Sequence, residues 1–205
     1  DPKAFSHFRW FWDYAGGMLT DWGVHLLDIV QWAFDEAMPK SIVALGGKYY
    51  LQDNRETPDT LQVTYEYPKG LLATYENRYG NAQSMFGKSY GILFHGERGT
   101  LFVDRSGYRL VPERRAEDLA EVEVKRFNDM NLDHWRNFAH SMRTRQRPIS
   151  DVEKCARSTV TCLLGNVALR SGLRIDWDEK NWTTVQAEGR KWLRREARSP
   201  WRIVV

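Results

Sequence analysis

The chain has 205 residues, a length that suits one folded domain with at most a short appendage. Hydrophobic residues make up 42% and charged residues 28%, which indicates a folded domain rather than a disordered chain. The net charge of +3, with acidic residues interleaved and no accompanying motif, argues against nucleic-acid binding, and no apolar stretch approaches the ~20 residues of a membrane span.

The N-terminal part of the sequence predicts a loop followed by a helix. Residues 5–14 are dense in aromatic side chains without a regular period, so we expect a loop or docking segment there. Gly16 and Gly17 break the chain after it. From Met18 to about Phe34 the apolar residues recur at helical spacing, which predicts an amphipathic helix.

The middle of the chain changes to the period of two that is typical of strands. Short connections rich in glycine and proline separate these strands, so we expect successive strands to pair antiparallel. The predicted strands are 41–50, 60–67, 71–79, 90–95, 100–104, 108–111 and 121–125.

Helical spacing returns after Asn128, with apolar stripes over 132–142 and 152–169 separated by Pro148. The tail from Trp177 predicts a short helix and an extended C-terminus. This order of elements indicates an α+β fold, an open and mostly antiparallel sheet with helices on one face. The uncovered sheet face predicts a homo-oligomer, because exposed apolar sheet is a usual interface.

Asp21 and His25 form the clearest candidate for chemistry. Residues four apart share a helix face, about 5–6 Å between Cβ atoms, so both side chains could converge on one ligand. A histidine can exchange a proton near neutral pH, and an aspartate can orient or stabilise it. Gly23 between them would let a cofactor or another chain approach closely. Spacing alone leaves open an ordinary helix pair with a core histidine.

The segment around this pair resembles the start of the C-terminal domain in the Gfo/Idh/MocA oxidoreductases. The shared pattern is a Gly16-Gly17 pair, then Asp21-x-Gly23-x-His25, an apolar pair and Asp28. Residues 93–101 and 134–177 are similar to later parts of that domain, so the resemblance covers most of residues 5–178.

The resemblance implies a chemistry in which NAD or NADP exchanges a hydride with a carbon bearing a secondary hydroxyl of a sugar, sugar derivative or cyclitol. His25 would be the general acid or base, alone or with a lysine, and Asp21 would orient and polarise the group. That lysine belongs to a Glu-Lys-Pro motif, which this sequence lacks, as it lacks a G-x-G-x-x-G fingerprint.

These absences lead to an expected domain organisation. We expect residues 1–178 to be a C-terminal substrate-binding and oligomerisation domain, with residues 179–205 as an extension that packs on it. The N-terminal Rossmann domain, which would bind most of the cofactor, is absent from this chain. We therefore expect a dehydrogenase as the full-length protein and an inactive isolated chain.

Further candidates surround the Asp21–His25 pair. Aromatic faces and polar groups suit a sugar, so we expect substrate binding by Arg9, Trp12, Tyr14, Trp22, Asn77 and Arg78. Core packing and surface pairing are the alternatives for these residues. The remaining histidines have no partners at metal spacing, so we expect no metal site. Two basic clusters, 143–147 and 190–198, suit solvated surface or a subunit contact, with an anion site as the alternative.

Three functions remain open from the sequence. The leading hypothesis is the catalytic half of a sugar or polyol dehydrogenase. The second is an NAD-dependent glycoside hydrolase on the same scaffold, and the third is a non-catalytic sugar-binding or oligomerisation module. In each case we expect a small-molecule sugar or polyol as the partner, no nucleic acid, no membrane, and a cytoplasmic location with export of the parent protein left open.

Overall fold

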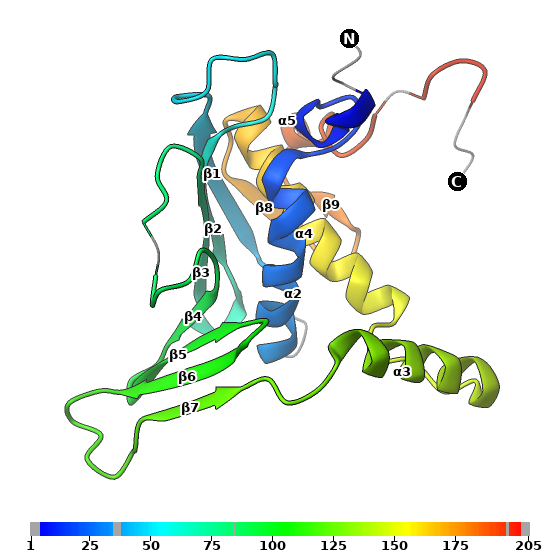
Figure 1. The fold of residues 1–205 in the computed structure, drawn as a ribbon. Helices are drawn as coiled ribbons and strands as arrows, with labels where there is room; N and C mark the ends of the chain where they lie inside the picture. Colours follow the sequence, from blue (N-terminus) through cyan, green and yellow to red (C-terminus); the bar gives the residue numbers. More distant parts are fainter. Residues whose placement is uncertain (1–4, 35–37, 84, 196, 202–205) are drawn as a thin grey trace. The chain divides into compact units, whose positions relative to one another are not determined.

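The structure is a computed structural model that describes residues 5–34, 38–83, 85–195 and 197–201. Figure 1 shows its helices and strands. The chain divides into two compact units. The first combines residues 1–81 with residues 152–205, and the second comprises residues 82–151. All of the site residues predicted from the sequence belong to the first unit.

The first unit is built on a five-stranded antiparallel sheet in the order β3-β2-β1-β8-β9. A short turn, η3 (Pro68–Gly70), joins β2 to β3 with positive φ angles of 65° at Lys69 and 78° at Gly70. The strands are β1 (Ser41–Gly47), β2 (Thr60–Glu66), β3 (Leu72–Arg78), β8 (Ile175–Asp178) and β9 (Thr183–Thr184).

Two long helical segments cover one face of this sheet (Figure 1). The first is a π-helical turn, η2 (Leu19–Gly23), that runs directly into α2 (Val24–Ala33), and the second is α4 (Val152–Ser171). Two short elements complete the unit, the 3-10 turn η1 (Phe8–Trp10) and α5 (Ala187–Arg190). The strands alternate buried and exposed positions, and the core between sheet and helices includes Leu19, Leu27, Ile42, Leu61, Val63, Tyr65, Tyr75 and Ile175.

Glycines allow these helices to approach their neighbours unusually closely. A Cβ at Gly165 of α4 would lie 2.7 Å from both Leu19 Cδ2 and Tyr65 Oη. A Cβ at Gly23 would lie 3.0 Å from the Tyr75 ring. The junction of η2 and α2 is therefore packed against both α4 and β3 at distances that a larger side chain would prevent.

Two polar contacts, one of them fully buried, fix α2 against α4. Gln31 Nε2 donates to Thr161 Oγ1 at 2.8 Å, and Ser158 Oγ donates to Asp28 Oδ1 at 2.5 Å. Because Gln31 and Thr161 are almost fully buried, breaking their bond would leave unpaired polar groups at a cost of about 1–3 kcal/mol.

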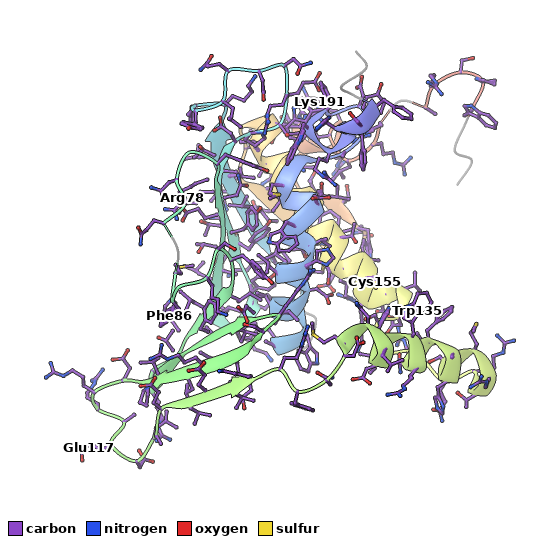
Figure 2. All side chains as sticks on the ribbon, viewed as in Figure 1. Arg78, Phe86, Glu117, Trp135, Cys155 and Lys191 are labelled. Atoms are coloured by element: carbon purple, nitrogen blue, oxygen red, sulfur yellow. The ribbon has the colours of Figure 1, made fainter. Side chains whose placement is uncertain are left out.

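The second unit contains a four-stranded antiparallel meander and one helix, α3 (Met130–Thr144). The strands are β4 (Ile92–His95), β5 (Gly99–Asp104), β6 (Gly107–Pro112) and β7 (Val122–Lys125). Asp129 caps α3 by accepting hydrogen bonds from the backbone of Asn131 and Leu132. Trp135 projects from α3 with 66% of its surface exposed (Figure 2).

The α+β class and the mostly antiparallel pairing predicted from the sequence are confirmed. The strands form two sheets rather than one, because β3 and β4 each lie at the edge of a sheet and do not pair with each other. The sequence also missed β8 and β9, which have four and two residues and are too short to show a clear period. None of the described helices is both long and apolar enough to cross a bilayer.

Gly165→Ala tests the close approach of α4. Alanine normally stabilises a helix interior by about 1 kcal/mol relative to glycine. Here we expect a net loss of about 1–3 kcal/mol in the free energy of unfolding, because the methyl group would force Tyr65 or Leu19 to move. Urea denaturation measures the change.

Gly96→Ala is the control for Gly165→Ala. Gly96 lies in an exposed turn, and the nearest atom to an added Cβ is 3.4 Å away, so we expect little change. A Gly165→Ala protein as stable as the unchanged protein, or more stable, would contradict the close packing.

Candidate functional site

Asp21 and His25 lie on either side of the junction between η2 and α2. Asp21 is in the π-helical turn and His25 is in the first turn of α2. Single π-turns within helices occur frequently at functional sites, because the extra residue shifts the side chains around it. Both side chains are on the exposed side of the helix.

The Gly16–Gly17 pair fixes where this helix begins. Gly17 has a φ of 70°, and a Cβ there would lie 2.7 Å from Thr57 Cβ. The carbonyl of Gly16 accepts a hydrogen bond from Asn166 Nδ2 at 2.8 Å. The start of η2 is therefore held between the loop that precedes β2 and the buried face of α4.

Arg9 holds the carboxylate of Asp21. Arg9 Nε lies 3.1 Å from Asp21 Oδ2, and the two side chains are 38% and 39% exposed. The contact is an ion pair without hydrogen-bond alignment. The Arg9 guanidinium also lies 5.6 Å from the Phe8 ring centre and 5.8 Å from that of Trp10. Arg9 thereby links the predicted catalytic aspartate to η1.

Trp22 packs against His25. Their ring centres are 5.9 Å apart with an edge-to-face angle of 74°. Trp22 is half-buried and His25 is exposed, so the tryptophan restricts the imidazole without covering it. The structure thus brings four of the predicted residues, Arg9, Asp21, Trp22 and His25, to one surface.

Tyr79, just beyond β3, extends this surface, and Tyr75 of β3 is buried beneath the helix junction; neither tyrosine was predicted from the sequence. Burial raises the pKa of Tyr75 well above its usual range, and the neighbouring Tyr79, Cys162 and Asp21 add to the increase. Burial also raises the pKa of Tyr79; Asp21 adds to the increase, while Arg55 and Arg9 oppose it. Both phenols therefore stay protonated and can donate hydrogen bonds. The spacing of two between residues 75, 77 and 79 could have predicted that their side chains share one face of the strand.

Asn77 and Arg78 lie on opposite faces of β3. Asn77 Nδ2 donates to the carbonyl of Asp59 at 3.2 Å, and Asn77 Oδ1 is buried without a hydrogen-bond partner among the described residues. Arg78 pairs instead with the exposed Glu76 at 2.9 Å, at the end of the strand (Figure 2). Asn77 therefore faces the same side as the tyrosines, and Arg78 does not.

Asp59 anchors the end of β3 from the loop before β2. Its carbonyl accepts from Asn77 and from the backbone N–H of Tyr79 at 3.0 Å. Burial alone would raise the pKa of the Asp59 carboxyl, but hydrogen bonds from four neighbours lower it to about 2. These donors are the backbone N–H groups of Leu51, Tyr50 and Tyr49 and the hydroxyl of Thr60. The ionised carboxylate thereby fixes the loop.

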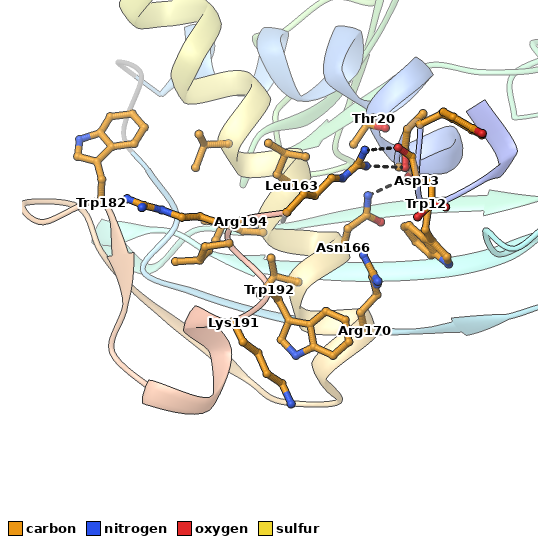
Figure 3. A pocket seen from close by; sticks show the side chains of 18 of the residues that line it. Trp12, Asp13, Thr20, Leu163, Asn166, Arg170, Trp182, Lys191, Trp192 and Arg194 are labelled. Atoms are coloured by element: carbon orange, nitrogen blue, oxygen red, sulfur yellow. Dashed lines mark hydrogen bonds between the residues drawn. The ribbon is translucent and has the colours of Figure 1, made fainter. Parts of the chain in front are cut away.

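Trp12 and Tyr14 line a different feature, a cavity of about 1220 Å³ between residues 12–20, α4 and the C-terminal segment (Figure 3). Neither Asp21 nor His25 lines it. The predicted substrate-binding residues are thus divided between two places in the first unit. Among the residues that the structure describes, no group of three or more His, Cys, Asp and Glu side chains is placed to hold a metal ion.

Several solved structures with this fold are described as oxidoreductases or dehydrogenases. One is an aldose-aldose oxidoreductase from Caulobacter crescentus complexed with glycerol, with a TM-score of 0.66 and 16% identity over 86% of this chain and 51% of that one. A second is the WlbA dehydrogenase from Bordetella pertussis in complex with NADH and UDP-GlcNAcA, with a TM-score of 0.55 and 16% identity over 84% of this chain and 48% of that one.

A third is the UDP-N-acetylglucosamine 3-dehydrogenase GnnA from Acidithiobacillus ferrooxidans, with a TM-score of 0.55 and 15% identity over 72% of this chain and 45% of that one. The chain therefore spans about half the length of each of these proteins. No curated protein sequence matches it significantly.

The sequence profile described as GFO/IDH/MocA C-terminal domain matches residues 1–102, about half of the chain. The matched range contains Arg9, Asp21, Trp22 and His25. Together with the shared fold, this match shows that the chain belongs to the Gfo/Idh/MocA family and corresponds to its C-terminal domain.

Proposed function

We propose that the Asp21–His25 surface is the acid–base site of an NAD(P)-dependent oxidoreductase acting on a secondary hydroxyl of a sugar, sugar derivative or cyclitol. One observation carries the proposal. An exposed imidazole lies next to an aspartate that an arginine holds in place, and both lie in the segment that matches the family profile. Related solved structures are complexes with NADH and UDP-GlcNAcA and with glycerol, which supports the substrate class and the cofactor.

The residues of this surface have separate roles in the proposed reaction. His25 takes the proton from the substrate hydroxyl during oxidation and returns it during reduction. Asp21 accepts a hydrogen bond from the substrate and stabilises the positive charge that develops on the imidazole. Arg9 keeps the Asp21 carboxylate in position, and Trp22 offers an apolar face to the ring of the substrate.

Tyr79 and Asn77 are further candidates for substrate contact. Each has a buried polar atom, Tyr79 Oη and Asn77 Oδ1, without a hydrogen-bond partner among the described residues. A substrate with several hydroxyl groups could satisfy both atoms. Arg78 is a weaker candidate for substrate contact, because its side chain lies on the other face of β3.

The residues of this chain do not fit the dinucleotide part of the cofactor. A dinucleotide site needs a glycine-rich turn between a strand and a helix N-terminus, and the sequence has none. Gly23, which could have admitted a cofactor, is instead explained by its packing against Tyr75. We assign the dinucleotide to an N-terminal domain outside this chain. The division into residues 1–178 and an extension, 179–205, belongs to the same proposal.

The two alternatives differ from this function in measurable ways. A glycoside hydrolase that uses NAD transiently would cleave a glycoside without net formation of NADH. A sugar-binding or oligomerisation module would bind a polyol without any turnover. The exposed His25 beside a fixed carboxylate favours the dehydrogenase over a binding module, because binding alone needs no proton acceptor.

His25→Asn and Asp21→Asn in the full-length protein test the acid–base assignment. We expect either change to lower kcat/KM by about 10²–10⁴-fold, because each removes a group that moves or stabilises the transferred proton. The measurement is formation of reduced nicotinamide from NAD and NADP over a panel of sugars, sugar acids and cyclitols.

The matched control is His95→Asn, which alters an exposed histidine of β4 in the second unit. We expect this variant to keep the original rate. Unchanged turnover in His25→Asn would refute the acid–base role, and glycoside cleavage without reduced nicotinamide would favour the hydrolase.

We further propose that the uncovered face of the five-stranded sheet joins copies of the protein. Val43, Leu45 and Leu72 are exposed on that face at 44%, 82% and 65%. We expect light scattering of the full-length protein to give a multiple of the monomer mass at micromolar concentration. Leu45→Glu should weaken association by about tenfold or more, because it places a charge in the apolar contact.

Val185→Glu changes an exposed aliphatic residue outside this sheet face and should leave the association unchanged. A strictly monomeric protein, or equal effects of the two substitutions, would count against the sheet interface.

A further inference from the structure

The cavity that receives Trp12 and Tyr14 has an unusual balance of charge. Among the described residues, five cationic side chains line it and Asp13 is the single carboxylate. Most of the cations come from the second basic cluster of the sequence, in the C-terminal segment (Figure 3). The cationic residues are Arg170, Lys191, Arg194, Arg195 and Arg198.

In the part of the chain that the structure describes, only Arg195 among these cations forms hydrogen bonds within the protein. Arg195 donates to the carbonyls of Asp13 and Ala15, at 2.8 Å and 3.2 Å, and so ties the C-terminal segment to the start of the site helix. Within the described chain, no carboxylate forms an ion pair with the other four. Cations gathered around one cavity create a positive potential that favours an anion.

Tryptophans give the cavity flat apolar surfaces beside these charges. The Arg170 guanidinium is sandwiched between Trp12 and Trp192, with its central carbon 4.8 Å and 4.7 Å from the two ring centres. Trp182 and Trp201 also line the cavity and are 43% and 71% exposed. Exposed indole rings can stack on the apolar C–H face of a sugar ring.

Two buried polar groups in the lining indicate a hydroxyl-rich ligand. Asn166 is 6% exposed, and its Oδ1 has no hydrogen-bond partner among the described residues, although its Nδ2 is bonded to Gly16. Trp177 is 9% exposed, and its Nε1 likewise lacks an acceptor in the described chain. One group accepts and the other donates, and a hydroxyl can satisfy either.

We infer that this cavity binds an anionic saccharide, a sugar ring that carries a carboxylate or a phosphate, at a site separate from the Asp21–His25 surface. The cations hold the anionic group, the tryptophans stack on the ring, and the buried amide and indole are available to its hydroxyl groups. The inference does not depend on the proposed dehydrogenase activity, because none of the cavity residues is needed for the proton transfer.

Isothermal titration calorimetry of the full-length protein tests this site with four probes. Glucuronate and glucose 6-phosphate are the anionic saccharides, glucose is the neutral one, and AMP is a nucleotide anion. We expect saturable binding of at least one anionic saccharide, about tenfold or more tighter than that of glucose or AMP. The preferred probe distinguishes a carboxylate from a phosphate ligand.

A triple variant, Lys191→Gln, Arg194→Gln and Arg198→Gln, locates the binding. These side chains are exposed, so their substitution should not unfold the protein. We expect the variant to weaken binding of the anionic saccharide by about tenfold or more, as three charges that face the anion are lost. The matched control removes three other exposed charges, with Arg114→Gln, Arg115→Gln and Arg143→Gln, and should keep the original affinity.

A second comparison separates the cavity from the Asp21–His25 surface. The Asp21→Asn, His25→Asn double variant should bind the anionic saccharide with unchanged affinity. The inference would be overturned by loss of binding in this double variant, or by equal losses of affinity in the Lys191/Arg194/Arg198 triple variant and its control. It would also be overturned if glucose or AMP bound as tightly as the anionic saccharides or more tightly, or if neither anionic saccharide bound.

Discussion

The close packing of three glycines is the constraint on which the first unit depends. Gly165 lets α4 approach the sheet and Leu19, Gly23 lets the helix junction rest on Tyr75, and Gly16 lies against Asn166. An added Cβ would be only 2.7 Å from its neighbours at Gly165 and 2.4 Å at Gly16, and at Gly23 it would lie 3.0 Å from Tyr75, which would have to shift by a few tenths of an ångström. Together they fix the η2–α2 segment from two sides, which is what sets the direction of its exposed surface.

That packing explains how the short Asp21–His25 motif forms an exposed surface with groups suited to proton transfer. The helix junction brings Asp21 and His25 to one exposed side, and η1 supplies Arg9 to hold the carboxylate. The end of β3, anchored through Asp59, adds Tyr79 next to them. The residues that suit a hydroxyl-bearing substrate thus come from three separate segments of the chain. The proposed anion-binding cavity is formed instead by the C-terminal half of α4 and the C-terminal segment.

Much of this arrangement could be predicted from the sequence, because helix and strand periods are local properties. The α+β class, the long helices and the Asp21–His25 pair were predicted in this way. The division into two sheets could not be, since it depends on which strand edges meet. Contacts between segments far apart in the chain likewise decide three other features: the position of Tyr79 near Asp21, the placement of Trp12 away from His25, and the positive charge around the cavity.

The proposed acid–base role requires a polyol to bind against His25. Two-dimensional NMR of the full-length protein, labelled with ¹⁵N at histidine and tryptophan, tests it during titration with the polyol that gives the highest turnover. We expect saturable shifts of the His25 imidazole and the Trp22 indole, with His95 unchanged. Shifts confined to Trp12 and Trp182 would instead place the polyol in the cavity and rule out His25 as its proton acceptor.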